Sequence, residues 1–93
     1  MTDVPTVRNN TALSRFELET GAGTAVVLYR AAPGILTLYH TEVPQALRGQ
    51  GIASRLLHDA LEQMRSDGLK AVPACGFVRQ YLATHPEFDD VRG

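Results

Sequence analysis

The strongest constraint on the fold is the segment TEVPQALRGQGIASRLL, residues 41–57, which runs from an extended stretch through two nearby glycines into a helical pattern. Up to Pro44 the chain carries short β-branched and aromatic segments. After Pro44, apolar residues recur every three to five positions and charged residues take the opposite helical face. A chain whose period changes once, from strands to helices, is expected to pack helices against a sheet. The predicted fold class is therefore α+β.

The segments before this junction are predicted to form strands. In residues 14–19, Phe16 and Leu18 alternate with charged residues, which is typical of a half-buried strand. The segments TGAG at 20–23 and AAPG at 31–34 provide residues that suit tight turns. Because short turns connect the strands, we expect an antiparallel meander. The predicted strands cover residues 6–9, 14–19, 24–30 and 34–43.

The second half of the chain predicts a helix, a strand and a second helix. The first helix begins within residues 49–52 and ends before Gly68, which suits the position just after a helix C-terminus. A short strand is expected at 69–73, and the second helix at 76–85, ending before Pro86. A strand, a helix and another strand in succession usually form a crossover with parallel pairing. We therefore expect a mixed, mostly antiparallel sheet with two helices packed mainly on one face.

Length and charge bound the organisation and exclude some functions. The chain has 93 residues, which predicts one domain, 1–93, with a loose arm at its first few residues. With nine basic and ten acidic residues, the chain lacks the excess of positive charge that is typical of nucleic-acid-binding proteins. No apolar run is long enough to cross a bilayer, and the start MTDVPTVRNN lacks the layout of a signal peptide. We therefore expect no nucleic-acid or membrane partner and a cytoplasmic location.

The junction itself predicts an anion-binding site. The first turn of a helix has unpaired backbone N–H groups at the positive end of the helix dipole. Glycine at 49 and 51 leaves space beside those donors, and Arg48 adds a cation, so we interpret the junction as a pyrophosphate cradle. The alternative is a helix start whose glycines only ease a tight turn. A dinucleotide motif would need a third glycine where Ser54 stands, and no Walker Gly-Lys-Ser/Thr sequence is present.

The sequence RGQGIA at 48–53 resembles the acyl-CoA pyrophosphate motif of the GNAT superfamily of N-acetyltransferases, Arg/Gln-x-x-Gly-x-Gly/Ala. Arg48, Gly51 and Ala53 occupy its three defining positions. Together with GLKAVPACGFVRQYLATHPEF further on, the chain resembles the very short single-domain GNAT-like acetyltransferases over residues 14–90. The resemblance implies a compact GNAT-like fold, an acyl-CoA cleft between splayed strands, and acetyl-CoA or CoA as cosubstrate.

The resemblance also implies which residues bind the cosubstrate. The strand at Thr41, Glu42 and Val43 would hydrogen-bond the pantetheine arm, and the loop amides would hold the pyrophosphate. The thioester would lie close to Ala74 and Cys75, so that these positions converge on one groove. The expected cofactor-binding residues are Thr41, Val43, Arg48, Gly49, Gln50, Gly51, Ile52, Ala53 and Tyr81.

Two candidate bases lie on the last predicted strand of the meander. His40 and Glu42 are two residues apart, so their side chains point to the same face. Acetyl transfer needs a neutral amine, and either side chain could take the ammonium proton. The alternatives are a partly buried histidine on a sheet face and a solvated strand carboxylate. Both residues are therefore candidate catalytic residues.

Cys75, the only cysteine, excludes an internal disulfide framework and a cysteine-cluster zinc site. The three histidines show no paired spacing, so no metal site is expected. Cys75 precedes the second helix, whose dipole lowers a thiol pKa, and the short GNAT-like proteins carry a cysteine here, often followed by proline. Gly76 follows it in this chain and gives a looser helix start. We expect Cys75 in the active site but no obligatory acetyl-cysteine; the alternative is a small buried hydrophobe.

Tyr81 lies on the helix where larger GNAT enzymes place a tyrosine that protonates the CoA thiolate, although its register differs from the usual spacing. We expect its ring in the core and its hydroxyl near the cofactor. His85, just before Pro86, is either a cation at the helix C-terminus or a ligand.

The predicted function is transfer of acetyl from acetyl-CoA to a primary amine by direct attack. The acceptor is a small molecule or a lysine or N-terminal amine. The alternative is a non-catalytic acyl-CoA-binding or interaction module. Larger GNAT enzymes build much of the acceptor site from two helices between their first strands, for which this chain has no room. We therefore expect an acceptor groove that is shallow, open, or completed by a partner protein or a second copy of the chain.

Overall fold

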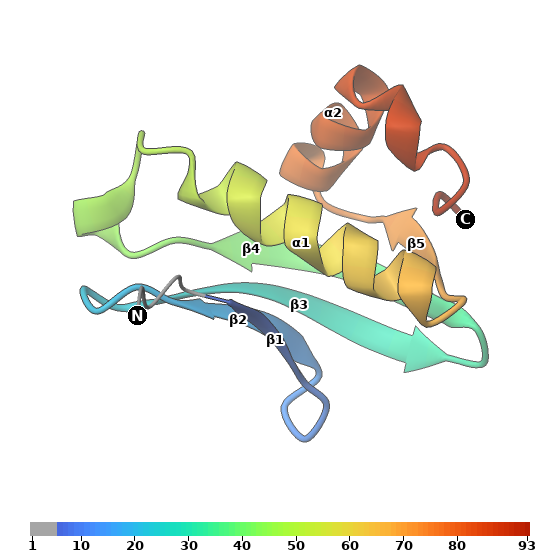
Figure 1. Ribbon diagram of the computed structural model, residues 1–93, viewed down its shortest axis with the longest axis horizontal. Coiled ribbons are helices and arrows are strands. Elements are labelled where there is room, and N and C mark those ends of the chain that lie inside the picture. Colours follow the sequence, from blue (N-terminus) through green and yellow to red (C-terminus); the bar gives the residue numbers. More distant parts are fainter. Residues whose placement is uncertain (1–5) are drawn as a thin grey trace.

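The computed structural model describes residues 6–93 (Figure 1), so the expected loose arm at the first few residues lies mostly outside the described chain. Five strands and two helices make up the fold, and short 3-10 helices follow β4 and α2. In chain order the elements are β1 (Val7–Asn10), β2 (Arg15–Glu19), β3 (Thr24–Ala32), β4 (Ile35–Glu42), η1 (Gln45–Leu47), α1 (Ile52–Ser66), β5 (Lys70–Pro73), α2 (Gly76–Thr84) and η2 (Pro86–Phe88).

The five strands form one sheet in the order β1-β2-β3-β4-β5. The first four pair antiparallel with their chain neighbours, and β5 pairs parallel with β4. The predicted meander and the predicted crossover through α1 are both confirmed. The element ends differ by one or two residues. The largest shift is at β3, which continues to Ala32 because the turn needs only Pro33 and Gly34.

Both helices lie on one face of the sheet (Figure 1), and the core lies between them and that face. Phe16 and Leu18 of β2 are buried on this face, in agreement with their predicted alternation. Helix α1 packs across β1, β2, β3 and β5, while α2 and η2 lie beside it. The helical residues in this core are Leu56, Leu57, Ala60, Leu61, Met64, Val78, Tyr81, Leu82 and Phe88.

The other face of the sheet, called the open face here, is covered by neither α1 nor α2. Charged side chains stabilise its β1–β2 end. Glu17 accepts hydrogen bonds from Arg15, Arg8 and Asn10 at 2.6, 2.9 and 3.0 Å. The hydrogen bond from Arg15 lowers the pKa of Glu17 to about 2, against the opposing effect of burial, with help from Asn10 and Arg8. The open face therefore carries a fixed network of charges.

Within residues 6–93, neither helix has the length and apolar character that a bilayer-crossing segment requires.

Candidate functional site

Strands β4 and β5 separate halfway along β4. Their parallel register ends where Leu38 pairs with Pro73, and the N–H of Ala74 donates to the carbonyl of Leu38 at 2.9 Å. Strand β4 then continues alongside β3 as far as Glu42, while the chain after β5 turns into α2. The predicted splay between these strands is confirmed. It leaves the far half of β4 facing the start of α2.

A β-bulge in β4 changes which of its side chains face the helices. Tyr29 pairs with Leu38 and Leu28 pairs with His40, so the register skips Tyr39. One extra residue in an antiparallel strand reverses the alternation of side chains beyond it. Side chains that face the helices therefore lie at even positions before the bulge and at odd positions after it. This change from even to odd positions in the spacing of the core-facing residues is the sequence signal from which the bulge could have been predicted.

The bulge places two pairs of predicted site residues on opposite faces of β4. Thr41 pairs with the core residue Val27, and its Oγ1 lies 3.8 Å from Sγ of Cys75 on the helix-covered face. On the open face, Nε2 of His40 lies 3.2 Å from Oε2 of Glu42, and the two side chains are 52% and 65% exposed. The prediction that His40 and Glu42 share a face is confirmed. Thr41 and Cys75, two of the positions expected to converge on one groove, lie side by side, and the convergence of the glycine loop with them stays a prediction.

The segment between β4 and α1 ends in two glycines with left-handed backbone conformations. The φ angle is 81° at Gly49 and 75° at Gly51, which is the N-cap residue of α1. No side chain caps the helix, and its first turn contains no acidic residue. The backbone N–H groups of residues 49–54 donate to no acceptor within residues 6–93. Unpaired donors at the positive end of a helix dipole attract an anion.

The glycines are required by their backbone conformation. A Cβ at Gly49 or Gly51 would meet no other atom within 4 Å, but L-residues rarely adopt such φ angles. The space in front of the loop is therefore open, as a bound phosphate would require. Nε2 of Gln50 donates to the carbonyl of Ala46 at 3.4 Å. Ile52 and Ala53 form the first turn of α1, where Ile52 packs partly against the core.

Cys75 is the N-cap residue of α2, and its side chain is half-buried. Burial raises the pKa of its thiol. The N–H groups of Val78 and Phe77, the Thr41 hydroxyl and the charge of Arg79 together outweigh burial, so the net pKa is lowered. The predicted effect of the helix start on this thiol is therefore confirmed in direction. The described chain contains no cluster of three histidine, cysteine or acidic side chains that could hold a metal ion.

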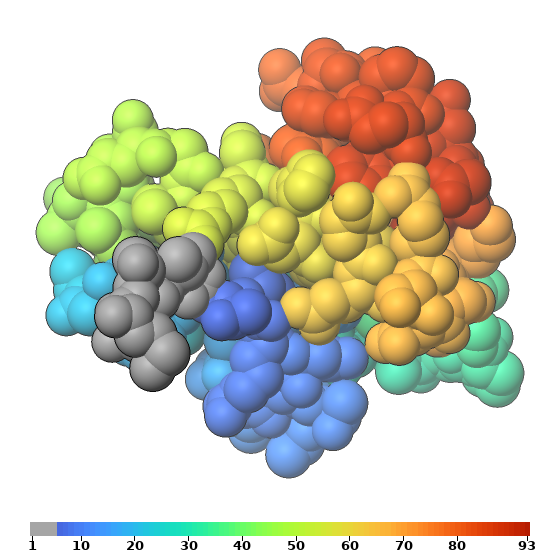
Figure 2. Space-filling view, viewed as in Figure 1, coloured from blue at the N-terminus to red at the C-terminus, as the bar shows by residue number. Residues whose placement is uncertain are grey.

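Tyr81 lies at a recess between α2 and the first turn of α1. Figure 2 shows that the surface is indented between these two segments. Tyr81 is only 6% exposed, and its ring stacks on the ring of His85 with centroids 3.7 Å apart, which confirms its place in the core. Burial raises the pKa of Tyr81, and Glu87, Asp59 and Glu62 add to that rise. Ser54, Phe77, Gln80 and Thr84 also line this recess of about 260 Å³. His85 is the C-cap residue of α2, and its Nδ1 lies 2.7 Å from the carbonyl oxygen of Tyr81.

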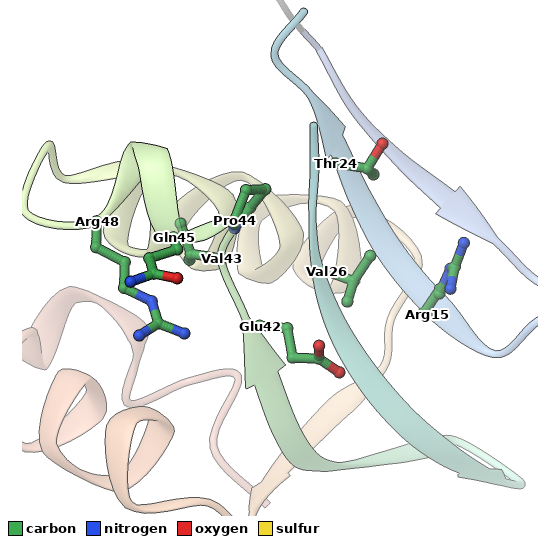
Figure 3. A pocket seen from close by; sticks show the side chains of 8 residues that line it. All are labelled: Arg15, Thr24, Val26, Glu42, Val43, Pro44, Gln45 and Arg48. Carbon is green, nitrogen blue, oxygen red and sulfur yellow. The ribbon is translucent and has the colours of Figure 1, made fainter. Parts of the chain in front are cut away.

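A cavity of about 430 Å³, called the open-face pocket here, lies on the open face at the end of β4 (Figure 3). Its lining residues are Arg15, Thr24, Val26, Glu42, Val43, Pro44, Gln45 and Arg48. The contributions of β2 and β3 to this pocket were not predicted from the sequence, and Arg48 was predicted only at the glycine loop. Arg15 alternates with Phe16, so its place on the open face was available from the sequence. That Arg15 lines the same pocket as Glu42 depends on pairings across three strands.

Comparison with known proteins identifies relatives of this arrangement. Residues 15–91 match the sequence profile described as GCN5-related N-acetyl-transferase. Protein NATD1 of Gallus gallus and of Mus musculus is 41% identical over 63 residues, which is 67% of this chain and 57% of each relative. Protein NATD1 of Homo sapiens is also 41% identical over 63 residues, or 56% of its own length. The match thus spans little more than half of these curated relatives.

The fold has a counterpart in a solved structure. The solution NMR structure of a "GCN5-like putative N-acetyltransferase" from Staphylococcus aureus superposes with a TM-score of 0.73 over 99% of this chain and 91% of that one. The two sequences are 23% identical, so this comparison supports the fold alone. The profile covers most of the chain and includes the parted strands, the glycine loop and both helix starts. The protein belongs to the GCN5-related N-acetyltransferase family.

Proposed function

We propose that this protein transfers an acetyl group from acetyl-CoA to a primary amine by direct attack. The observation that carries the proposal is the run of unpaired N–H groups in residues 49–54, which follows the half of β4 that extends beyond its pairing with β5. A pyrophosphate fits these donors, and the extended arm of the cosubstrate fits the free half of β4. Both features occur together in a member of the GCN5-related N-acetyltransferase family.

The residues that would hold the cosubstrate come from three segments. The backbone of β4 at Thr41 and Val43 would bind the pantetheine arm. The loop and first helical turn would bind the pyrophosphate through the backbone N–H groups of Gly49, Gln50, Gly51, Ile52 and Ala53. The side chain of Arg48, at the start of this loop, lines the open-face pocket instead. Tyr81, at the recess between α1 and α2, would complete the site with its hydroxyl. Burial and nearby carboxylates raise the pKa of this hydroxyl, so it stays protonated and is able to donate a proton.

The acceptor amine would approach from the open face. An ammonium ion must first lose a proton, and the exposed Glu42, paired with His40, would accept it. The amine nitrogen then attacks the thioester carbonyl carbon, and the carbon–sulfur bond breaks. The attacking nitrogen loses a second proton and the departing thiolate takes one up, so the products are an N-acetyl amine and free CoA. The residues of this chain supply orientation and proton transfer.

Cys75 would border the thioester from the helix-covered face without forming a bond to the acetyl group. Its lowered pKa favours the thiolate, but His40 and Glu42 lie on the other side of β4. The side chain within hydrogen-bonding reach of its sulfur is the hydroxyl of Thr41. A nucleophilic cysteine normally works with an adjacent base that is in turn held by a third group. Direct transfer therefore suits this arrangement better than an acetyl-cysteine.

A second function, binding of acyl-CoA without transfer, is favoured by one feature. Neither helix covers the open face, so an acceptor would be held in a pocket that is open to solvent. A protein that only senses or presents acyl-CoA needs the loop and the free edge of β4 but no acceptor site.

Mass spectrometry separates the two functions. Acetyl-CoA is incubated with the protein and a panel of polyamines, amino acids and lysine peptides, and both acetyl-CoA loss and the acetylated amine are measured. The proposal requires amine-dependent loss of acetyl-CoA, with stoichiometric N-acetyl product. CoA binding without turnover across the whole panel would favour the binding module.

A further inference from the structure

The open-face pocket places one carboxylate and two guanidinium groups around an apolar floor. Figure 3 shows Glu42 at the end of β4, Arg48 on the loop and Arg15 on β2, with Val26 and Pro44 between them. The cavity of about 430 Å³ falls within the size range of small-ligand sites. It can therefore accept a short molecule with polar groups at its ends.

The two guanidinium groups differ in their availability. Nε of Arg15 donates to Oε2 of Glu17 at 2.6 Å, and the side chain of Arg15 is 35% exposed. Its charge is thus largely matched by a fixed partner. Arg48 is exposed and forms no ion pair with any residue from 6 to 93. Arg48 is therefore the cation that a ligand can engage.

We infer that the acceptor is a short amine that also carries an anionic group, such as an ω-amino acid. This inference rests on the proposed function. The ammonium group would lie at Glu42, where the proton is removed, and the anion would lie at Arg48, a planar donor suited to carboxylate or phosphate. The short aliphatic segment between them would cover Val26 and Pro44.

The same charges disfavour other amines. A diamine would place its second ammonium group near Arg48, and like charges disfavour binding. A neutral amine would leave Arg48 solvated and would gain nothing from it. The pocket therefore discriminates by charge at the end of the acceptor remote from the reacting nitrogen.

The test compares three acceptors of equal chain length at saturating acetyl-CoA. These are 4-aminobutyrate, its neutral amide 4-aminobutanamide, and 1,4-diaminobutane. We expect kcat/KM for 4-aminobutyrate to exceed that for the amide by about tenfold, the value of one charge-assisted contact. The ratio between acceptors is used because Arg48 also belongs to the glycine loop, and an effect on cosubstrate binding cancels in the ratio.

Charge reversal supplies the second arm of the test. Arg48→Glu should invert the preference, so that 1,4-diaminobutane becomes the better acceptor. Arg92→Glu makes the same change at an exposed position near the C-terminus and should leave the ratios of the parent protein unchanged. Equal transfer to all three acceptors by the parent protein would overturn the inference and leave the acetyltransferase assignment intact. The same conclusion follows if Arg48→Glu and Arg92→Glu behave alike.

An NMR titration without acetyl-CoA keeps the inference testable even if no acceptor is acetylated. 4-Aminobutyrate should shift the Val26 methyl signals in the parent protein at concentrations where 4-aminobutanamide does not. Arg48→Glu should abolish this difference. Absence of transfer to any amine would refute the proposed function, and the titration would then decide the charge preference of the pocket by itself. Equal shifts from both compounds, or none from either, would overturn the inference.

Discussion

The two faces of β4 hold chemically different halves of the candidate site. On the helix-covered face, Thr41 and Cys75 meet in a half-buried environment beside the start of α2. On the open face, His40 and Glu42 pair with each other and are more than half exposed. The covered face provides backbone donors and a thiol. The open face provides the exposed carboxylate and imidazole.

The difference suggests that the two faces of β4 have separate functions. A long, flexible cosubstrate is better held where helices limit its motion, and a small amine is better received where solvent has access. The bases and the cysteine do not face each other, so the thiol lacks an evident partner for nucleophilic catalysis. The following predictions test whether the two faces act separately.

The largest effect is expected from Glu42→Gln, which removes a base from the open face. General-base catalysis contributes about 10²- to 10⁴-fold, so kcat/KM should fall by about a hundredfold or more. CoA affinity should stay within about twofold, because the backbone of β4 is unchanged. Thiol release measures the rate, and calorimetric titration measures the affinity. Asp89→Asn removes an exposed carboxylate at the C-terminal end of η2 and should change neither the rate nor the CoA affinity. A parallel loss of rate and CoA affinity would instead place Glu42 in the cosubstrate site.

Gly51→Val should weaken CoA binding by about tenfold or more, since a β-branched residue is strongly disfavoured at a φ of 75°. The added side chain would also protrude into the space in front of the loop. Gly34→Val is the matched control, because Gly34 has a φ of 74° and a Cβ there also meets nothing within 4 Å. Both variants should lose stability in urea, but calorimetry should find weaker CoA binding only for Gly51→Val. Unchanged affinity in Gly51→Val would remove the anion site from this loop.

Cys75→Ala should retain substantial turnover, with a fall below about tenfold, because it removes only a neighbour of the thioester. The loss of an obligatory nucleophile would cost far more. Steady-state thiol release measures the effect, and intact-protein mass spectrometry after mixing with acetyl-CoA looks for an adduct. An acetyl group on Cys75 that an added amine discharges at the rate of turnover would refute direct transfer.

The smallest expected effect concerns the pH dependence of Cys75 alkylation. Its pKa is lowered, so the iodoacetamide rate should reach its midpoint below the pH found for the urea-unfolded chain. Thr41→Val removes a hydroxyl that favours the thiolate, and the midpoint should therefore rise, by less than about one pH unit. His40→Ala, on the other face of β4, should leave the midpoint unchanged. An equal shift in His40→Ala would show that the two faces are electrostatically coupled.

The sequence predicts most of the fold because local pattern determines it. The alternation around Phe16 and Leu18 indicates β2, and the apolar spacing after Pro44 indicates α1. The positive φ angles of the loop were also foreseeable, since glycine at two nearby positions marks such a turn. These features depend on residues close together in the chain.

The arrangement of the candidate site was harder to predict from the sequence because it depends on pairings between strands. Arg15 lines the same pocket as Glu42 only because β2 pairs with β3 and β3 pairs with β4 in one particular register. The bulge at Tyr39 then decides which face each site residue takes. A strict alternation along β4 would have placed Glu42 on the same face as Leu38. The candidate residues were therefore easier to predict from the sequence than the faces of β4 that they occupy.

The bulge at Tyr39 also bears on which changes in chain length the protein tolerates. Deleting this one residue would remove the bulge and keep the present pairings, so His40 would still pair with Leu28 and Glu42 with Val26, both on the open face. Deleting Thr41 while the bulge is kept would instead bring Glu42 opposite the core residue Val27. The charged group of Glu42 would then be buried, at a severe cost in stability. In a library of single-residue deletions along this strand, deletion of Tyr39 should therefore be found more often among folded proteins than deletion of Thr41.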